Sequence, residues 1–134
     1  MAFDFYRIDS WDDEKFRMYL NDQLVLESPK FSLHRKETGT ISGSTGGISW
    51  TMVPDPESYG KKAFGRWNEQ TFAVTLTIPP NNSTESRLTI KFGSTLDGGI
   101  SDESWGIDNF ALKRLSACET CAIDSEDFSA GAAG

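Results

Sequence analysis

Hydrophobic and polar residues alternate along much of the chain, which is the pattern of β-strands with one buried face. In Thr71–Ile78 the apolar side chains share one face and threonines occupy most of the other. Similar strands are expected at residues 3–8, 16–20, 23–27, 87–92 and 108–113. Because turn-forming residues separate these short strands and no segment has a helical period, the chain is predicted to be all-β, as a two-sheet sandwich or a barrel.

Two segments do not follow the alternating pattern. Residues 36–49 are rich in Gly, Ser and Thr and are predicted to form a flexible loop anchored by Ile41 and Ile48, and residues 93–104 are predicted to form a second, acidic loop. We assign residues 1–117 to one β-sandwich domain and residues 118–134 to a C-terminal tail.

Charge excludes some classes of partner. The 134 residues include 20 Asp and Glu against 13 Lys and Arg, for a net charge of -7. Since phosphate binding needs a concentrated basic face, nucleic acid is not an expected partner. No apolar run reaches the length of a membrane span, so membrane insertion is not expected either.

The sequence has one Cys-x-x-Cys pair, Cys118 and Cys121, and one histidine, His34. Such a pair can be a redox centre, half of a zinc site or a local disulfide. Zinc would need further ligands, and a redox pair would be expected at the start of a helix that follows a strand. We interpret the cysteines as structural or incidental and His34 as a surface residue, and we expect no enzyme activity.

Two acidic segments each contain a tryptophan. Four carboxylates and Trp11 lie within residues 9–14, and the acidic stretch 97–103 leads directly to Trp105. Crowded carboxylates repel one another unless a hard cation such as Ca²⁺, which takes six to eight oxygen ligands, binds between them. The alternative is that both segments are solvated turns, as acidic residues usually are.

If the two segments meet, they predict a shared calcium site. Asp9 and Asp12 are three positions apart across a tight turn and can face one ion, while Asp108 or Asn109 can complete the shell from a neighbouring strand. Trp11 and Trp105 are then expected to pack beneath the loops and hold the site in place.

Three stretches, FDFYRIDSWDDEKFRMYLND, GRWNEQTFAVTLTI and LTIKFGSTLDGGISDESWGIDNFAL, resemble calcium-binding jelly-roll modules related to MAM and laminin-G-like sandwiches. Such modules recur in large secreted proteins and adhesins. The resemblance covers roughly residues 2–115 and is most specific in IDSWD and DESWGIDN. It implies a two-sheet antiparallel, jelly-roll-like β-sandwich with a structural calcium held by Asp9, Asp12 and Asp108, and with Asp102 and Glu103 as further candidates.

The same resemblance implies a non-catalytic binding or adhesion module, extracellular or at a cell surface, that recognises a glycan or a peptide. Trp50, Tyr59 and Trp67 are the candidate ligand-binding residues, because sugars stack on aromatic rings. Calcium could instead chelate vicinal hydroxyls or a carboxylate of the ligand directly.

The alternative is a purely structural spacer that calcium makes rigid, with neighbouring modules of the same chain as its partners. The acidic-aromatic tail IDSEDFSAGAAG resembles the start of such a module. It is either a displaced first strand or the beginning of a following copy.

Overall fold

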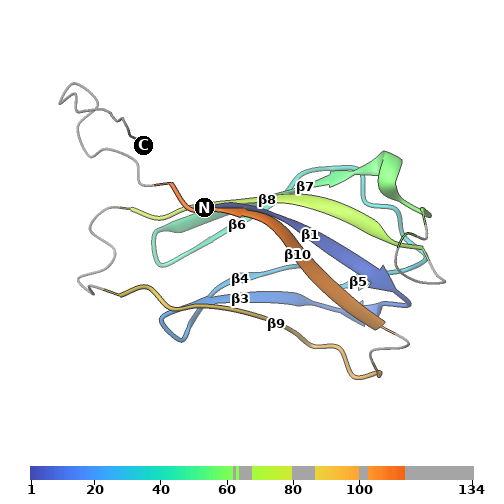
Figure 1. Ribbon diagram of the computed structural model, residues 1–134, viewed down its shortest axis with the longest axis horizontal. Coiled ribbons are helices and arrows are strands. Elements are labelled where there is room, and N and C mark those ends of the chain that lie inside the picture. The colour runs from blue at the N-terminus through green and yellow to red at the C-terminus, as the bar shows by residue number, and fades with distance from the viewer. Residues whose placement is uncertain (62, 64–67, 80–86, 100–102, 114–134) are drawn as a thin grey trace.

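The computed structural model describes residues 1–61, 63, 68–79, 87–99 and 103–113, and Figure 1 draws the rest as a thin grey trace. The proposed domain boundary after residue 117, the two cysteines, Trp67 and Asp102 lie outside the described residues.

Short antiparallel strands make up nearly all of the regular structure in the described residues, with one turn of 3-10 helix. The elements are β1 (Ala2–Asp9), β2 (Asp12–Glu14), β3 (Phe16–Leu20), β4 (Gln23–Glu27), β5 (Phe31–Ser32), β6 (Ile41–Thr45), β7 (Ile48–Asp55), η1 (Pro56–Ser58), β8 (Gln70–Thr77), β9 (Ile90–Ser94) and β10 (Glu103–Ala111).

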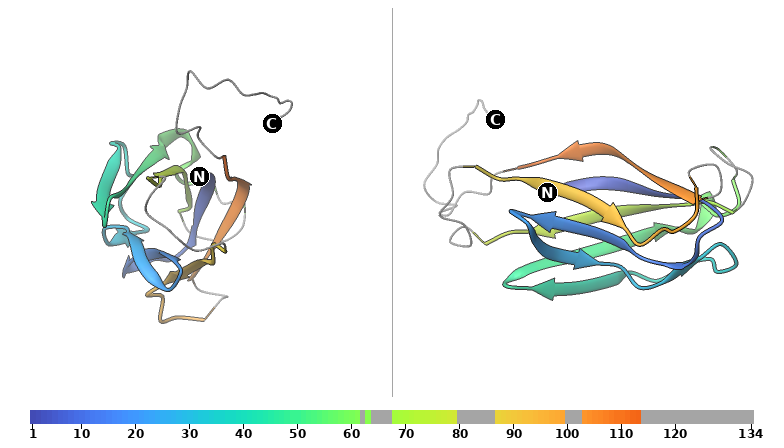
Figure 2. Two further views of the ribbon diagram at one scale, coloured as in Figure 1. Left: turned by 90° about the vertical axis from the view of Figure 1, so that its left-hand side faces the viewer. Right: turned by 90° about the horizontal axis from the view of Figure 1, so that it is seen from below.

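The strands form two layers, as Figure 1 and the two turned views in Figure 2 show. One layer is a five-stranded sheet in the order β10-β1-β8-β7-β6. The other contains the three-stranded sheet β4-β3-β9, which the pair β2-β5 extends, since β2 and β3 are separated by a single residue. This is the all-β antiparallel sandwich that the alternating pattern predicts, and it is jelly-roll-like in that the chain passes repeatedly from one layer to the other.

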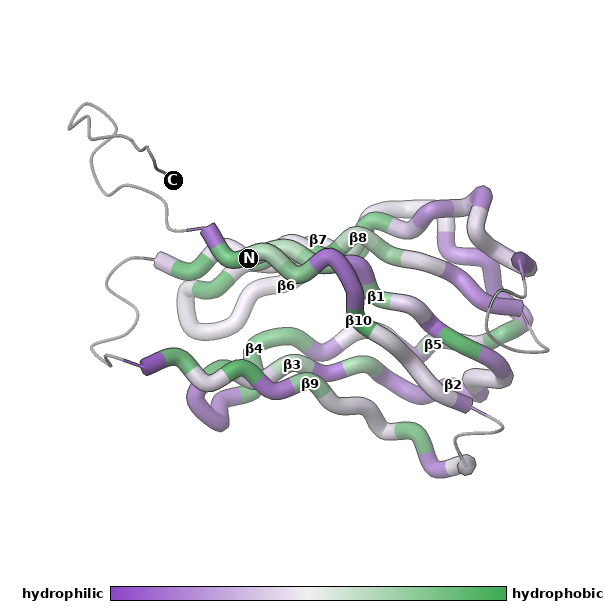
Figure 3. Tube along the Cα trace, viewed as in Figure 1, coloured by the Kyte–Doolittle hydropathy of each residue, from purple (hydrophilic) through white to green (hydrophobic). Residues whose placement is uncertain are grey.

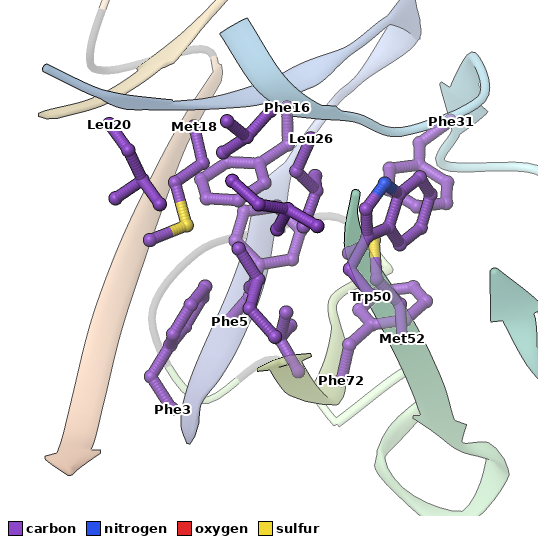
Figure 4. Close-up of a cluster of buried hydrophobic side chains, with 14 of the residues drawn as sticks. Phe3, Phe5, Phe16, Met18, Leu20, Leu26, Phe31, Trp50, Met52 and Phe72 are labelled. Carbon is purple, nitrogen blue, oxygen red and sulfur yellow. The ribbon is translucent and has the colours of Figure 1, made fainter. Parts of the chain in front are cut away.

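The core lies between the layers because each strand turns alternate side chains inward, and Figure 3 shows hydrophobic and hydrophilic residues alternating along the strands. Phe5 at the centre of β1 is fully buried. Its ring centroid lies 4.2 Å from that of Phe16 in the opposite layer and 5.8 Å from that of Phe72 on the neighbouring strand. Figure 4 shows these rings with Phe31, Trp50 and Met52 filling the space between the sheets.

The prediction of a loop at residues 36–49 is wrong for most of that segment. Residues 41–45 and 48 onward form the hairpin β6–β7, which turns at Gly46 and Gly47 with φ values of 58° and 84°. Two consecutive positive φ values match the twist of a tight hairpin, and glycine adopts them without strain. Gly43 has a packing reason instead, because an added Cβ would lie 2.6 Å from Cζ2 of Trp50 on the paired strand. The three glycines are therefore explained by the geometry of the turn and by the packing of Trp50.

The predicted alternation at 108–113 is interrupted by a β-bulge. The register changes from Asp4 opposite Asp108 to Ala2 opposite Ala111, and Asn109 has a φ of 54°. The extra residue turns Phe110 toward the other layer, where its ring meets that of Phe92 on β9 at 6.5 Å, and it also stacks 6.4 Å from Phe3 on the neighbouring β1. Asp108 and Phe110 therefore do not share a face, although they are two positions apart.

Candidate metal centre

The pairing of β1 with β10 brings the two acidic, tryptophan-containing segments together. Asp9 lies opposite Glu103, and Arg7 lies opposite Trp105 in the antiparallel register. Residues more than ninety positions apart in sequence thus become neighbours at the end of the sandwich where β1 ends and β10 begins (Figure 1).

Both tryptophans pack beneath this end, as the sequence predicts. Trp11 is fully buried, and its indole Nε1 donates a hydrogen bond to the main-chain oxygen of Ser104 at 2.7 Å. Trp105 is half-buried, packs edge-on against Phe16 at 5.5 Å and donates from Nε1 to Ser94 Oγ at 3.1 Å. Because Trp11 spans from the β1–β2 connection to β10, it fixes one acidic segment relative to the other.

The carboxylates that meet here are those of Glu14, Asp97 and Glu103. One oxygen of each lies within 4.8 Å of the others. Glu14 ends β2, Asp97 lies in the connection after β9, and Glu103 begins β10, so three separate segments contribute. Oxygen ligands at this spacing suit a hard divalent cation, whose distance to each oxygen is about 2.3–2.6 Å for Ca²⁺.

Backbone amides hold the two glutamates in place. The amide of Asp12 donates to Glu14 Oε1 at 2.5 Å, and the amide of Gly98 donates to Glu103 Oε2 at 2.5 Å. A Cβ added at Gly98 would overlap the Glu103 carboxylate. Asp13 adopts a φ of 76°, which lets β2 run into β3 with Glu14 turned inward. The carboxylates are therefore positioned by local main-chain geometry.

The second oxygen of Glu103, Oε1, is buried and has no hydrogen-bond partner among the described residues. Glu103 as a whole is 5% exposed and Glu14 is 7% exposed. Burial, reinforced by the neighbouring charge of Glu14, raises the pKa of Glu103 to about 7. A buried carboxylate oxygen without a donor is costly, and either a proton or a cation removes that cost.

The cluster forms part of the wall of an open cavity of about 290 Å³. The cavity is lined by Ser10, Asp12, Glu14, Leu33, His34, Asp97, Gly98 and Glu103. None of these described lining residues is a lysine or an arginine, so no side-chain cation of the cavity wall balances the carboxylates. A bound cation would balance these charges, and protonation of Glu103 would lower them.

The structure places some of the predicted calcium ligands in this cluster and others outside it. Glu103 belongs to the cluster, and Asp12 lines the same cavity. Asp9 is buried beside Glu103 across the strand pair but is not a member of the cluster. Two members, Glu14 and Asp97, were not among the predicted ligands, although both lie within the two acidic segments of the sequence.

The structure does not bring Asp108 and Asn109, two of the predicted ligands, to this cluster. Asp108 lies five residues along β10 from Glu103, which is about 17 Å in an extended strand. It faces Asp4 across the strand pair, and Asn109 Nδ2 donates to the Asp4 carboxylate at 2.7 Å. Coordination distances of about 2.3–2.6 Å exclude one ion bound by both ends of the strand.

The predicted aromatic ligand platform is not formed by Trp50 or Tyr59. Trp50 is 7% exposed and belongs to the core, because it lies on the inward face of β7. Tyr59 is half-buried, and its hydroxyl donates to the main-chain oxygen of Leu33 at 2.8 Å and accepts from Asn68 Nδ2 at 3.1 Å. It ties the segment after β7 to the one after β5. An open hollow over β6, β7 and β8 is lined by Trp50, Gly43 and six serine and threonine residues.

Comparisons with known proteins identify no relatives, since no family model matches the chain and no curated protein or solved structure gives a match. Among the described residues, no helix has the length and apolar character needed to cross a membrane.

Proposed function

We propose that this protein is a calcium-stabilised, non-catalytic binding or adhesion module of an extracellular protein, which recognises a glycan or a peptide. The observation that carries the calcium proposal is Glu103 Oε1, a buried oxygen to which no described residue donates a hydrogen bond, in a side chain that lies beside two further carboxylates. A cation at this point would replace repulsion by coordination.

Calcium suits the cluster better than other common metal ions. The three ligands offer only carboxylate oxygens, which favours hard cations over zinc or copper. Magnesium demands a near-ideal octahedral shell, whereas calcium accepts six to eight ligands in irregular geometry. Three carboxylates from three separate segments, held by different backbone contacts, fit the more tolerant ion.

Calcium binding would be coupled to the stability of the sandwich. Glu14 belongs to one layer, Glu103 to the other, and Asp97 to a connection between them. An ion that binds all three joins the two layers at this end, and it stabilises the folded state by about 2.7 kcal/mol when its concentration is 100 times its dissociation constant.

The second candidate function is a structural spacer that calcium makes rigid. The burial of Trp50 favours it, and so does the Arg7 guanidinium 6.0 Å from the centre of the half-buried Tyr59 ring, because both leave less aromatic surface for a sugar. The open cavity beside the carboxylates favours the binding module, because a purely structural ion is usually enclosed by protein.

Thermal unfolding of the full chain with calcium and with chelator tests the calcium proposal. At about 5 mM CaCl₂, above the Kd of about 10⁻⁴–10⁻³ M typical of extracellular calcium modules, the wild type should melt at a higher temperature than in chelator. Glu103→Gln should abolish most of this difference. Asp108→Asn is the matched control on the same strand, about 17 Å away, and should retain it.

If calcium leaves the melting temperature of the wild type unchanged, the proposed calcium site is wrong. If Asp108→Asn removes the calcium response and Glu103→Gln does not, the ion binds at the other end of the strand.

A further inference from the structure

The three described carboxylates of the cluster can supply only part of a calcium shell. Glu14 Oε1 and Glu103 Oε2 each accept a hydrogen bond from a backbone amide. Each glutamate therefore has one oxygen without such a bond, and Asp97 can supply one or two more. Three or four oxygens from these three described side chains are fewer than the six to eight that calcium takes, so the cluster alone leaves positions for other ligands.

The unfilled positions lie next to space that a ligand can enter. The cavity of about 290 Å³ beside the cluster is several times larger than the roughly 30 Å³ of one water molecule. Its rim is formed in part by Asp12 and His34, both exposed, and by the half-exposed Ser10. These side chains offer hydrogen-bond donors and acceptors around the opening.

The charge of the cavity selects among oxygen ligands. Four carboxylates line it, those of Asp12, Glu14, Asp97 and Glu103, and a calcium ion balances only two of these charges. The surface around the bound ion therefore stays negative, in a chain whose net charge is -7. A ligand carboxylate would be repelled, whereas the hydroxyls of a neutral sugar coordinate without adding charge.

We propose that the ion held by Glu14, Asp97 and Glu103 binds two neighbouring hydroxyl groups of a neutral saccharide, which replace two of its water ligands. This inference rests on the proposed calcium site and selects a neutral glycan as its ligand. Asp12, Ser10 and His34 at the rim accept from or donate to further hydroxyls of the same sugar ring. Recognition therefore requires no exposed aromatic platform.

The first experiment counts the water ligands of the ion. Terbium replaces calcium in the full chain, and its luminescence lifetimes in H₂O and D₂O give the number of bound waters. We expect about two or more, falling by about two at saturating sugar. A protein that calcium stabilises but whose terbium holds one water or none has an enclosed ion, which overturns this inference and leaves the calcium site standing.

The second experiment identifies the ligand class. Amide spectra of the ¹⁵N-labelled, calcium-loaded chain are titrated with methyl glycosides of mannose, galactose, glucose and fucose, with fully O-methylated methyl mannoside as the matched negative probe and glucuronate as the anionic probe. We expect at least one free glycoside to shift the amides of residues 10–14 and 97–99, and neither comparison probe to do so. Chelator should abolish the shifts.

Variants then separate the cavity from the rest of the surface. Asp12→Asn and His34→Ala should each weaken binding of the active glycoside several-fold while the calcium-induced rise in melting temperature is retained. Asp22→Asn, in the hairpin turn between β3 and β4, is the matched control and should bind normally. Binding of glucuronate alone, or no binding of any glycoside by a calcium-loaded chain, overturns the proposal.

Discussion

Trp11 and Ser104 are joined by a 2.7 Å hydrogen bond from the indole Nε1 to the main-chain oxygen, across 93 positions of sequence. This bond links the β1–β2 connection to the second residue of β10, one residue after Glu103. The tryptophan inside the first acidic cluster therefore supports the proposed metal site from below, and it is not available as a surface for ligand binding.

Trp11→Phe should lower both the stability and the affinity for calcium. The variant loses the indole donor to the half-buried Ser104 oxygen, and loss of this hydrogen bond costs about 0.5–1.5 kcal/mol. The affinity should fall several-fold, because the glutamates on the two sides of this bond are less well positioned. Urea unfolding and calcium titration measure the two effects. Trp105→Phe, which loses only a bond to a serine hydroxyl, should reduce calcium affinity less.

Glu103→Gln should stabilise the protein when no divalent ion is present. The substitution removes a buried charge beside Glu14 and supplies an amide that can donate to that carboxylate. In calcium the order should reverse, because the wild type gains the energy of ion binding. Unfolding curves in metal-free and calcium-containing buffer would show this crossing, and a variant less stable than the wild type in both buffers would contradict it.

The raised pKa of Glu103 predicts the pH dependence of the metal-free protein. Its pKa in the folded state is about 7 against 4.5 for the ordinary side chain, so the folded state binds the proton more tightly than the unfolded state does. The contribution to stability is therefore fully present below pH 4.5 and is lost as the pH rises through 7. The difference in unfolding free energy between wild type and Glu103→Gln, followed from pH 4 to 8, isolates this group. A flat difference would contradict the prediction.

Asp108→Asn should slightly stabilise the protein. Asp108 lies directly opposite Asp4 on the outer face, and like charges in this position are destabilising by about 0.2–1 kcal/mol. The new side chain retains an oxygen to accept from the Asn109 amide, as Asp108 Oδ1 does at 2.8 Å. Chemical unfolding in low salt measures the gain, which should shrink in high salt because the repulsion is between exposed charges.

Tyr59→Phe should reduce stability by about 0.5–1.5 kcal/mol, because it removes the hydroxyl that bonds to Leu33 and Asn68. Binding of the active glycoside should be unchanged, since Tyr59 does not line the cavity beside the acidic cluster. A loss of glycoside binding without a loss of stability would contradict this prediction and indicate that Tyr59 contacts the ligand.

Local pattern accounts for the parts of the fold that were predicted correctly. Alternation in Thr71–Ile78 and in 16–20 reports directly which side chains face the core, because a strand has a period of two residues. The β6–β7 hairpin was missed because its residues are small and hydroxylated, and only the packing of Trp50 on Gly43 shows why. The sequence pattern predicted that Asp108 and Phe110 face the same side of β10. The bulge at Asn109 changes which side chains face inward, and nothing in the local pattern marks it.

The sequence by itself determined the all-β class, the clustering of carboxylates into two segments and the presence of a tryptophan beside each, because these depend on residue type and short spacing. Only the tertiary structure decided which carboxylates meet. Antiparallel pairing sets Glu103 beside Asp9 and carries Asp108 to the far end of the same strand pair. The turn after β1 then places the Glu14 carboxylate beside that of Glu103. Strand register and main-chain geometry, rather than the number of acidic residues, therefore determine which oxygens lie close together.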